Sequence, residues 1–143
     1  LYVRFSGAES AVHAARAKLG GEEVADGDGY WDALRDHQAA FFRTGEPLWR
    51  MSIKSTTPPL ALEGAQLVEW GGALRWIAGT FDAKTMRRAA ASAGGHATLF
   101  RGGDRSSGVF HPLAPPIAKL HQRLKATFDP HRILNPGRLY PDL

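Results

Sequence analysis

The sequence of 143 residues contains no cysteine, so a disulfide framework and a cysteine metal site are both excluded. It contains no apolar run as long as a membrane span and no recognisable signal peptide. The chain begins at Leu1, inside a strand-like run, rather than at a methionine. We therefore expect it to be part of a larger protein.

Sequence motifs of self-contained catalysis are also missing. There is no Walker sequence, no Gly-x-Ser-x-Gly and no His-Glu-x-x-His. The histidines do not pair with one another at the spacing of a helical metal site; they are His13, His37, His96, His111, His121 and His131. We therefore predict no metal site and assign no catalytic residue.

The composition that remains is that of a globular domain. Hydrophobic residues make up 43% and aromatic residues 10%, which is enough for one domain with a real core. The net charge of +4 favours anionic partners without identifying them. No strand combines basic residues with the stacking aromatics of an RNA-binding module, so we predict no nucleic-acid partner.

Hydrophobic periodicity predicts alternating strands and helices. The predicted strands cover residues 1–5, 22–25, 48–55, 66–78 and 96–101, and the helices 8–19, 30–42, 82–93 and 113–128. This order predicts an α+β, ferredoxin-like sandwich: a mostly antiparallel sheet with helices on one face, plus a C-terminal helix and tail. We expect residues 1–112 to form the sheet and helices, and residues 113–143 the C-terminal helix and tail of the same domain. The last helix is predicted to turn Ile117, Leu120, Leu124 and Phe128 inward.

Basic side chains suggest a site for a small carboxylate on the sheet. Within residues 48–55, Arg50 and Lys54 alternate with apolar residues, and Arg75 lies on the next predicted strand. If these two strands pair, the three cations can share a face, and guanidinium groups bind carboxylates through parallel hydrogen bonds. The alternative is a solvated face whose basic side chains have no ligand.

Trp70 stands immediately before Gly71-Gly72, in the middle of a predicted strand. Glycines there often mark a bulge or a close approach of another group to the backbone. Trp70 is therefore a candidate contact for a planar ligand. The alternative is a core aromatic residue.

The tail of residues 128–143 is too irregular for a core element and too specific for a frayed end. Asp129 and Asn135 each precede a proline, which biases both away from helical conformation. Gly137 allows close approach or a positive φ. We interpret the tail as a pinned loop whose backbone approaches another group. A helix stop followed by an ordinary docked end is the alternative.

Two segments, 69–76 (Glu-Trp-Gly-Gly-Ala-Leu-Arg-Trp) and 128–138 (Phe-Asp-Pro-His-Arg-Ile-Leu-Asn-Pro-Gly-Arg), carry a family resemblance. The chain resembles the C-terminal part of the FAD-binding subunits of glycolate oxidases, which are FAD-linked oxidases of the vanillyl-alcohol oxidase type. The resemblance implies a C-terminal cap domain that covers the flavin, and a tail that closes over it. The matching positions are Asn135, Pro136 and Gly137, with Arg138 where the family often has lysine. It also implies that FAD is bound mainly by an N-terminal domain absent from this chain.

The resemblance further implies a part in the oxidation of glycolate or a similar small 2-hydroxy acid, although this chain alone should be inactive. Expected partners are other glycolate oxidase subunits, in the cytoplasm and peripheral at the inner membrane through those subunits. Arg50, Lys54, Arg75 and Trp70 are the candidate substrate contacts. The chain lacks the histidine-rich metal motif that related subunits often carry, so a flavin or electron-relay role beside a catalytic partner subunit stays open. The alternative function is a ferredoxin-like binding or subunit-interaction module without redox activity.

Overall fold

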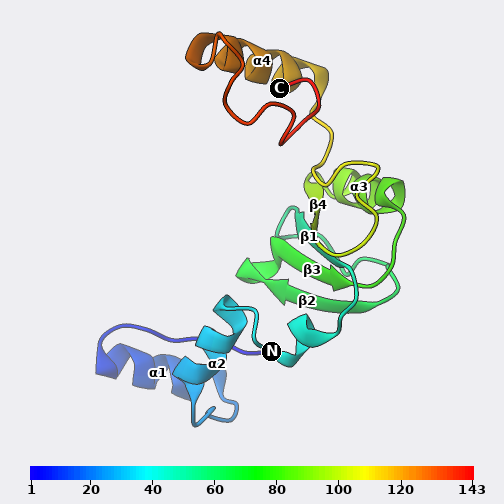
Figure 1. Ribbon diagram of the computed structural model, residues 1–143. Helices are drawn as coiled ribbons and strands as arrows, with labels where there is room; N and C mark the ends of the chain where they lie inside the picture. Colours follow the sequence, from blue (N-terminus) through cyan, green and yellow to red (C-terminus); the bar gives the residue numbers. More distant parts are fainter. The chain divides into compact units, whose positions relative to one another are not determined.

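The computed structural model describes all residues from Leu1 to Leu143. The chain divides into two compact units, Leu1–Ala39 and Ala40–Leu143 (Figure 1). We describe each unit by itself. None of the helices is both long and apolar enough to cross a membrane.

The first unit is helical, with α1 at Glu9–Leu19 and α2 at Gly27–Arg35. The strands predicted at residues 1–5 and 22–25 do not form, so that prediction is wrong. An alternating pattern becomes a strand only when a neighbouring strand supplies a hydrogen-bonded ladder. Here the side chains make other contacts instead: the Tyr2 ring stacks on Tyr30 with centroids 4.3 Å apart.

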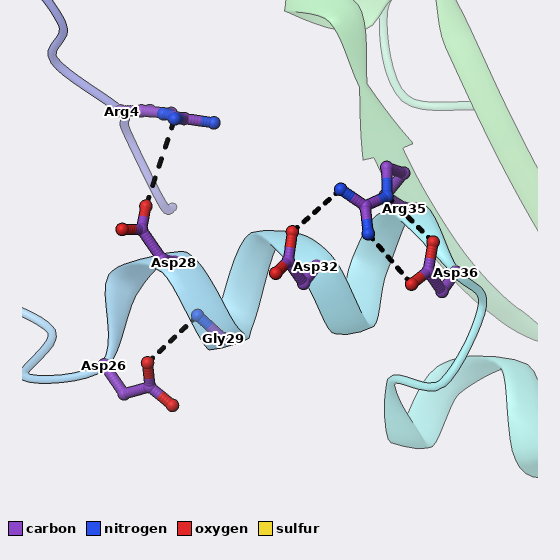
Figure 2. A network of polar contacts seen from close by, with 7 residues as sticks. All are labelled: Arg4, Asp26, Asp28, Gly29, Asp32, Arg35 and Asp36. Atoms are coloured by element: carbon purple, nitrogen blue, oxygen red, sulfur yellow. Dashed lines mark hydrogen bonds and ion pairs between the residues drawn. The ribbon is translucent and has the colours of Figure 1, made fainter.

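Polar contacts define the two ends of α2, as Figure 2 shows. The Asp26 carboxylate caps the helix by accepting a hydrogen bond of 3.0 Å from the amide of Gly29. At the other end, Arg35 forms ion pairs with Asp32 at 2.9 Å and Asp36 at 2.8 Å. The hydrogen bond from Arg35 lowers the pKa of Asp36. These side chains are solvent-exposed, so the pairs contribute little stability.

The second unit contains one antiparallel sheet in the order β2-β3-β1-β4. Its strands are β1 (Leu48–Ser52), β2 (Ala65–Glu69), β3 (Leu74–Ala78) and β4 (His96–Arg101). Helix α3 (Ala83–Ser92) connects β3 to β4, and α4 (Pro115–Phe128) precedes the tail. The predicted α+β class and the antiparallel sheet are confirmed. Where a ferredoxin-like fold has a helix between its first two strands, residues 53–64 form a loop.

The core lies between one face of the sheet and α3. The alternation of β1 places Trp49, Met51 and Ile53 on this face, as the sequence predicted. These side chains pack with Ile77 and Leu99 of the neighbouring strands and with Met86 of α3. Asp82 starts α3 by accepting a hydrogen bond from the amide of Thr85 at 2.9 Å.

The segment predicted as one strand at residues 66–78 is divided in two. It forms the hairpin β2–β3, with a tight 3-10 turn at Trp70–Gly72. The prediction of a continuous strand is wrong because the left-handed backbone of the turn reverses the chain. The reversal still leaves β2 and β3 adjacent in the sheet.

Helix α4 begins with two prolines, which suit the first turn because its amides lack partners within the helix. Its apolar side chains are exposed rather than inward, so that part of the prediction is wrong. The exposed fractions run from 46% to 79% for Ile117, Leu120, Leu124 and Phe128. Helical periodicity correctly predicts an apolar stripe, but it does not say what covers the stripe.

Candidate functional site

The first candidate site is the tail that follows α4, and Asp129 holds its start in place. The Asp129 carboxylate is 5% exposed and accepts hydrogen bonds from the amides of Ile133 at 3.0 Å and Leu134 at 2.9 Å. It also pairs with Lys125 Nζ at 2.6 Å, one helical turn earlier. The hydrogen bond from Lys125, followed by those from the two backbone amides, lowers the pKa of Asp129.

Lys125 completes this arrangement by donating a second hydrogen bond to the Leu134 carbonyl. Residues 129–134 are thus tied to the last turn of α4 through one carboxylate and one ammonium group. The interpretation of the tail as a pinned segment did not include Asp129 as the pin. Its spacing of four residues from Lys125, the spacing of a helical ion pair, was the available signal.

Beyond the pinned segment, Asn135-Pro136-Gly137 forms an exposed turn. Asn135 and Gly137 have φ values of 45° and 67°, and the amide of Arg138 donates to the Asn135 carbonyl at 3.2 Å. A Cβ atom added to Gly137 would meet nothing closer than the Pro141 carbonyl oxygen at 3.9 Å. The side chains of Asn135 and Arg138 make no hydrogen bond or ion pair within the chain. This turn therefore has free polar groups and free space beside it.

Helix α4 and the tail also line a cavity of about 480 Å³ that is open to solvent. Its size lies within the range of small-molecule sites. Leucine and phenylalanine side chains dominate the lining, and Lys125, Asn135 and Arg138 add polar groups. The far end of the tail is fixed by Tyr140, whose hydroxyl donates to the His111 carbonyl at 3.1 Å.

The second candidate site is the β2–β3 turn. Trp70 has a φ of 51°, an uncommon conformation for a bulky residue, and 73% of its side chain is exposed. The glycines that follow have φ values of 60° and 101°. A Cβ atom on Gly72 would lie 2.6 Å from the Ser55 carbonyl oxygen, so only glycine fits there. Trp70 is therefore exposed at a turn that only glycine can complete, and its role as a contact for a planar ligand stays a prediction.

Two hydrogen-bonded side chains hold this turn. The Arg75 guanidinium is 5% exposed and donates from Nε to the Gly72 carbonyl and from Nη2 to the Thr57 carbonyl, both at 2.8 Å. On the other face of the sheet, the indole Nε1 of Trp76 donates to Glu69 Oε2 at 2.6 Å. The strained conformation of Trp70 is thus maintained from both sides.

The predicted cluster of three cations on one face is not formed. In the antiparallel register Arg50 is opposite Trp76, whereas Arg75 is opposite Met51, so Arg50 and Arg75 lie on opposite faces. Arg50 rests over the Trp76 ring at 5.9 Å, which is a cation–π contact. Lys54 lies beyond the end of β1, and its side chain runs against Gly94 just after α3. The prediction failed because it fixed the pairing of the strands but not their register.

The tail has the features that a flavin cofactor requires of a protein. Gly137 has open space beside it, with its amide bonded to the Leu143 carbonyl, and the Asn135 side chain supplies an amide group without a partner in the chain. Arg138 supplies a cation that could lie near an anionic ring or phosphate. The residues present therefore fit such a group.

Comparison with known proteins agrees with these observations. Residues 113–139, which are α4 and most of the tail, match the family "FAD linked oxidases, C-terminal domain". The whole chain is 47% identical over 143 residues to "Glycolate oxidase subunit GlcE" of Escherichia coli (strain K12). The chain spans 39% of the length of that relative, and it matches no solved structure. The resemblance predicted from the two segments is thus confirmed: residues 113–139 match the C-terminal domain of FAD-linked oxidases, and all 143 residues align with a glycolate oxidase subunit.

Proposed function

We propose that the protein is an FAD-dependent oxidoreductase subunit that takes part in the oxidation of glycolate or a similar 2-hydroxy acid. Residues 1–112 would be the sheet and helices of its cap, and residues 113–143 its C-terminal helix and FAD-directed tail. The support is the match of residues 113–139 to FAD-linked oxidases and the identity of 47% to the glycolate oxidase subunit.

One observation carries the proposal for the tail. The segment that matches the oxidase family is also the segment whose large apolar side chains are exposed: 79% for Phe128 and 74% for Ile133. A concentration of such side chains marks a surface that another structure covers. We infer that this cover is the FAD-binding part of the oxidase, against which Asn135-Pro136-Gly137 and Arg138 would lie.

The bound FAD would supply the redox chemistry by accepting a hydride equivalent from the substrate. The chain's own residues position the cofactor and exclude water from it. Asp129 and Lys125 hold the start of the tail, so the Asn135-Pro136-Gly137 turn is presented in one conformation. Arg138 would stabilise negative charge on the cofactor, and the apolar stripe of α4 would keep the interface dry.

For the substrate we propose Arg50 and Trp70 as the contacts of the cap. Arg50 is half-buried on the sheet face, with its guanidinium over the Trp76 ring, and Trp70 projects from the β2–β3 turn. Arg75 and Lys54 would act indirectly, because Arg75 is buried under the turn and Lys54 packs beside Gly94. No residue of this chain is proposed as the catalytic base.

We further propose that the protein works with other glycolate oxidase subunits in the cytoplasm, and that those subunits bring it to the inner membrane. The support is the relative's name, which describes a subunit. A flavin or electron-relay role beside a catalytic partner subunit is compatible with this arrangement.

The experiment is a set of tail variants in the full-length flavoprotein. Asn135→Ala and Arg138→Ala should reduce the FAD retained on purification and slow flavin reduction by glycolate. Arg123→Ala is the matched control, because it removes a cation of α4 that does not line the cavity. The flavin content is read from absorbance, and the reduction rate from rapid mixing with glycolate. Normal flavin content and normal flavin reduction in both tail variants would refute the role of the tail. Absence of flavin from the unchanged full-length protein would favour a binding module instead.

A further inference from the structure

The two edge strands of the sheet differ in the hydrogen bonds that their outward backbone groups make. Strand β4 forms one edge, and a later part of the chain closes it: the Leu99 amide donates to the Val109 carbonyl at 2.9 Å, and the Ala97 amide donates to His111 Nδ1 at 3.3 Å. Strand β2 forms the other edge. Its backbone makes no hydrogen bond to any segment other than β3. The one link of β2 to another segment is the Gln66 side chain, which donates to the Leu60 and Leu62 carbonyls. The backbone of one edge is therefore closed and the backbone of the other is open.

The pairing pattern identifies the open groups. In an antiparallel ladder, successive residues direct their amide and carbonyl groups to opposite sides. The Leu99 amide points away from β1, which fixes this alternation across the sheet. The registers of β1 with β3 and of β3 with β2 extend this alternation to β2. The backbone amide and carbonyl of Leu67 therefore point toward β3, and those of Gln66 and Val68 point outward. The free edge thus offers the backbone amide and carbonyl groups of Gln66 and Val68.

Strand β2 lacks three of the features by which natural edges avoid unwanted pairing, namely lysine, proline and a β-bulge. The sequence Ala-Gln-Leu-Val-Glu has no lysine or proline, and the register with β3 is regular. Val68 exposes 53% of its side chain on this strand. Such an edge is suited to pairing with another extended segment.

The local charge indicates which kind of segment fits. Residues 55–74 contain no lysine or arginine but two acidic residues, Glu63 and Glu69, in a chain with a net charge of +4. A strand with basic side chains would be attracted to this edge. A second copy of β2 would instead bring the same two acidic residues.

We propose that β2 is a docking edge for an extended segment of a partner protein with basic side chains. The segment would add to the sheet as a further strand by pairing with the outward backbone groups of Gln66 and Val68. This inference is independent of the proposed redox function, since it concerns the sheet edge and not the tail.

The test uses the full-length protein and a synthetic peptide that alternates valine with lysine. The peptide should slow hydrogen exchange at the amides of Gln66 and Val68, which exchange rapidly in the free chain. Val68→Pro should weaken binding by roughly tenfold or more, because it removes an outward donor and leaves the ladder with β3 intact. Val68→Thr, the matched control, keeps the amide and the strand propensity and should bind like the unchanged chain.

The melting temperature of each variant shows whether the sheet is retained, and a valine–glutamate peptide tests the charge requirement. Protection of the two amides before peptide is added would refute the open edge. Equal binding by Val68→Pro, by a folded chain, would refute strand addition. Equal binding of the acidic peptide would refute the basic partner, and self-association that Val68→Pro abolishes would make the occupant a second copy.

Discussion

The Arg75 guanidinium offers the sharpest test of how the β2–β3 turn is held. Arg75→Met keeps the apolar stem but removes both hydrogen bonds, leaving the carbonyls of Gly72 and Thr57 without their donor. Hydrogen bonds from a charged group contribute about 1.5–3 kcal/mol each. Removing the buried charge also relieves a desolvation cost, which offsets part of this loss. We therefore expect the free energy of unfolding to fall by about 2–3 kcal/mol, which corresponds to roughly 10 °C in melting temperature.

The assay is urea and thermal unfolding of the 143-residue chain, followed by circular dichroism. Arg50→Met is the matched control, because it removes a cation from the opposite face whose contact with Trp76 contributes only about 0.5–1 kcal/mol. Arg75→Lys should recover little, since a single ammonium group cannot reproduce the fork of the guanidinium. Equal stability of Arg75→Met and the unchanged chain would refute the role of Arg75 as a clamp.

Three further predictions concern the turn, the tail and the closed sheet edge. Gly72→Ala should destabilise the sheet by about 2 kcal/mol or more, because the new Cβ clashes with the Ser55 carbonyl oxygen. Gly71→Ala, whose Cβ faces open space, should cost only about 1 kcal/mol, and unfolding curves compare the two variants. Because its pKa is lowered, Asp129 should stabilise the tail at neutral pH and lose this effect only as the pH falls below 3.8. Asp129→Asn should abolish that acid transition in the NMR signals of the tail. Burial, with the nearby charges of other side chains, lowers the pKa of His111. The hydrogen bond that the His111 ring accepts from the Ala97 amide should therefore be present above pH 6.5 and lost as the pH falls through the folded pKa. His111→Ala should remove this transition from amide exchange in β4.

Each of these predictions has an outcome that would contradict it. Equal destabilisation by the two alanine substitutions would show that backbone conformation alone, and not the clash, requires glycine. An acid transition that persists in Asp129→Asn would assign it to another group. For His111, unchanged amide exchange down to low pH would mean that the ring does not hold the edge of β4.

The sequence predicted the features of the second unit that depend on burial of one face. The alternation of Trp49, Met51 and Ile53 predicted β1 correctly because a half-buried strand has a period of two. The start predicted for the helix over residues 82–93 is also correct, because the capping side chain of Asp82 leaves a local signal in the sequence. These signals are contained within a few neighbouring residues.

The features that depend on distant partners could not be predicted. Residues 1–5 alternate like a strand, but no neighbouring strand pairs with them. The turn at Trp70 needs a left-handed tryptophan, which no sequence pattern favours. The face of the sheet on which Arg75 lies is set by the register between β1 and β3. For the tail, the turn at Asn135 was visible in its prolines and glycine, whereas the burial of Asp129 followed from the way the loop folds back on α4.

The pinning of the tail by Asp129 has a thermodynamic consequence for assembly. Ordering one residue of a flexible chain costs about 1–2 kcal/mol of conformational entropy. Residues 130–134 are held by the Asp129 carboxylate and by Lys125, so much of that entropy is lost when the chain folds and not when the tail docks. Each 1.4 kcal/mol that docking does not have to supply makes association about tenfold tighter. A single buried carboxylate can thus raise the affinity of the surface that it holds in place.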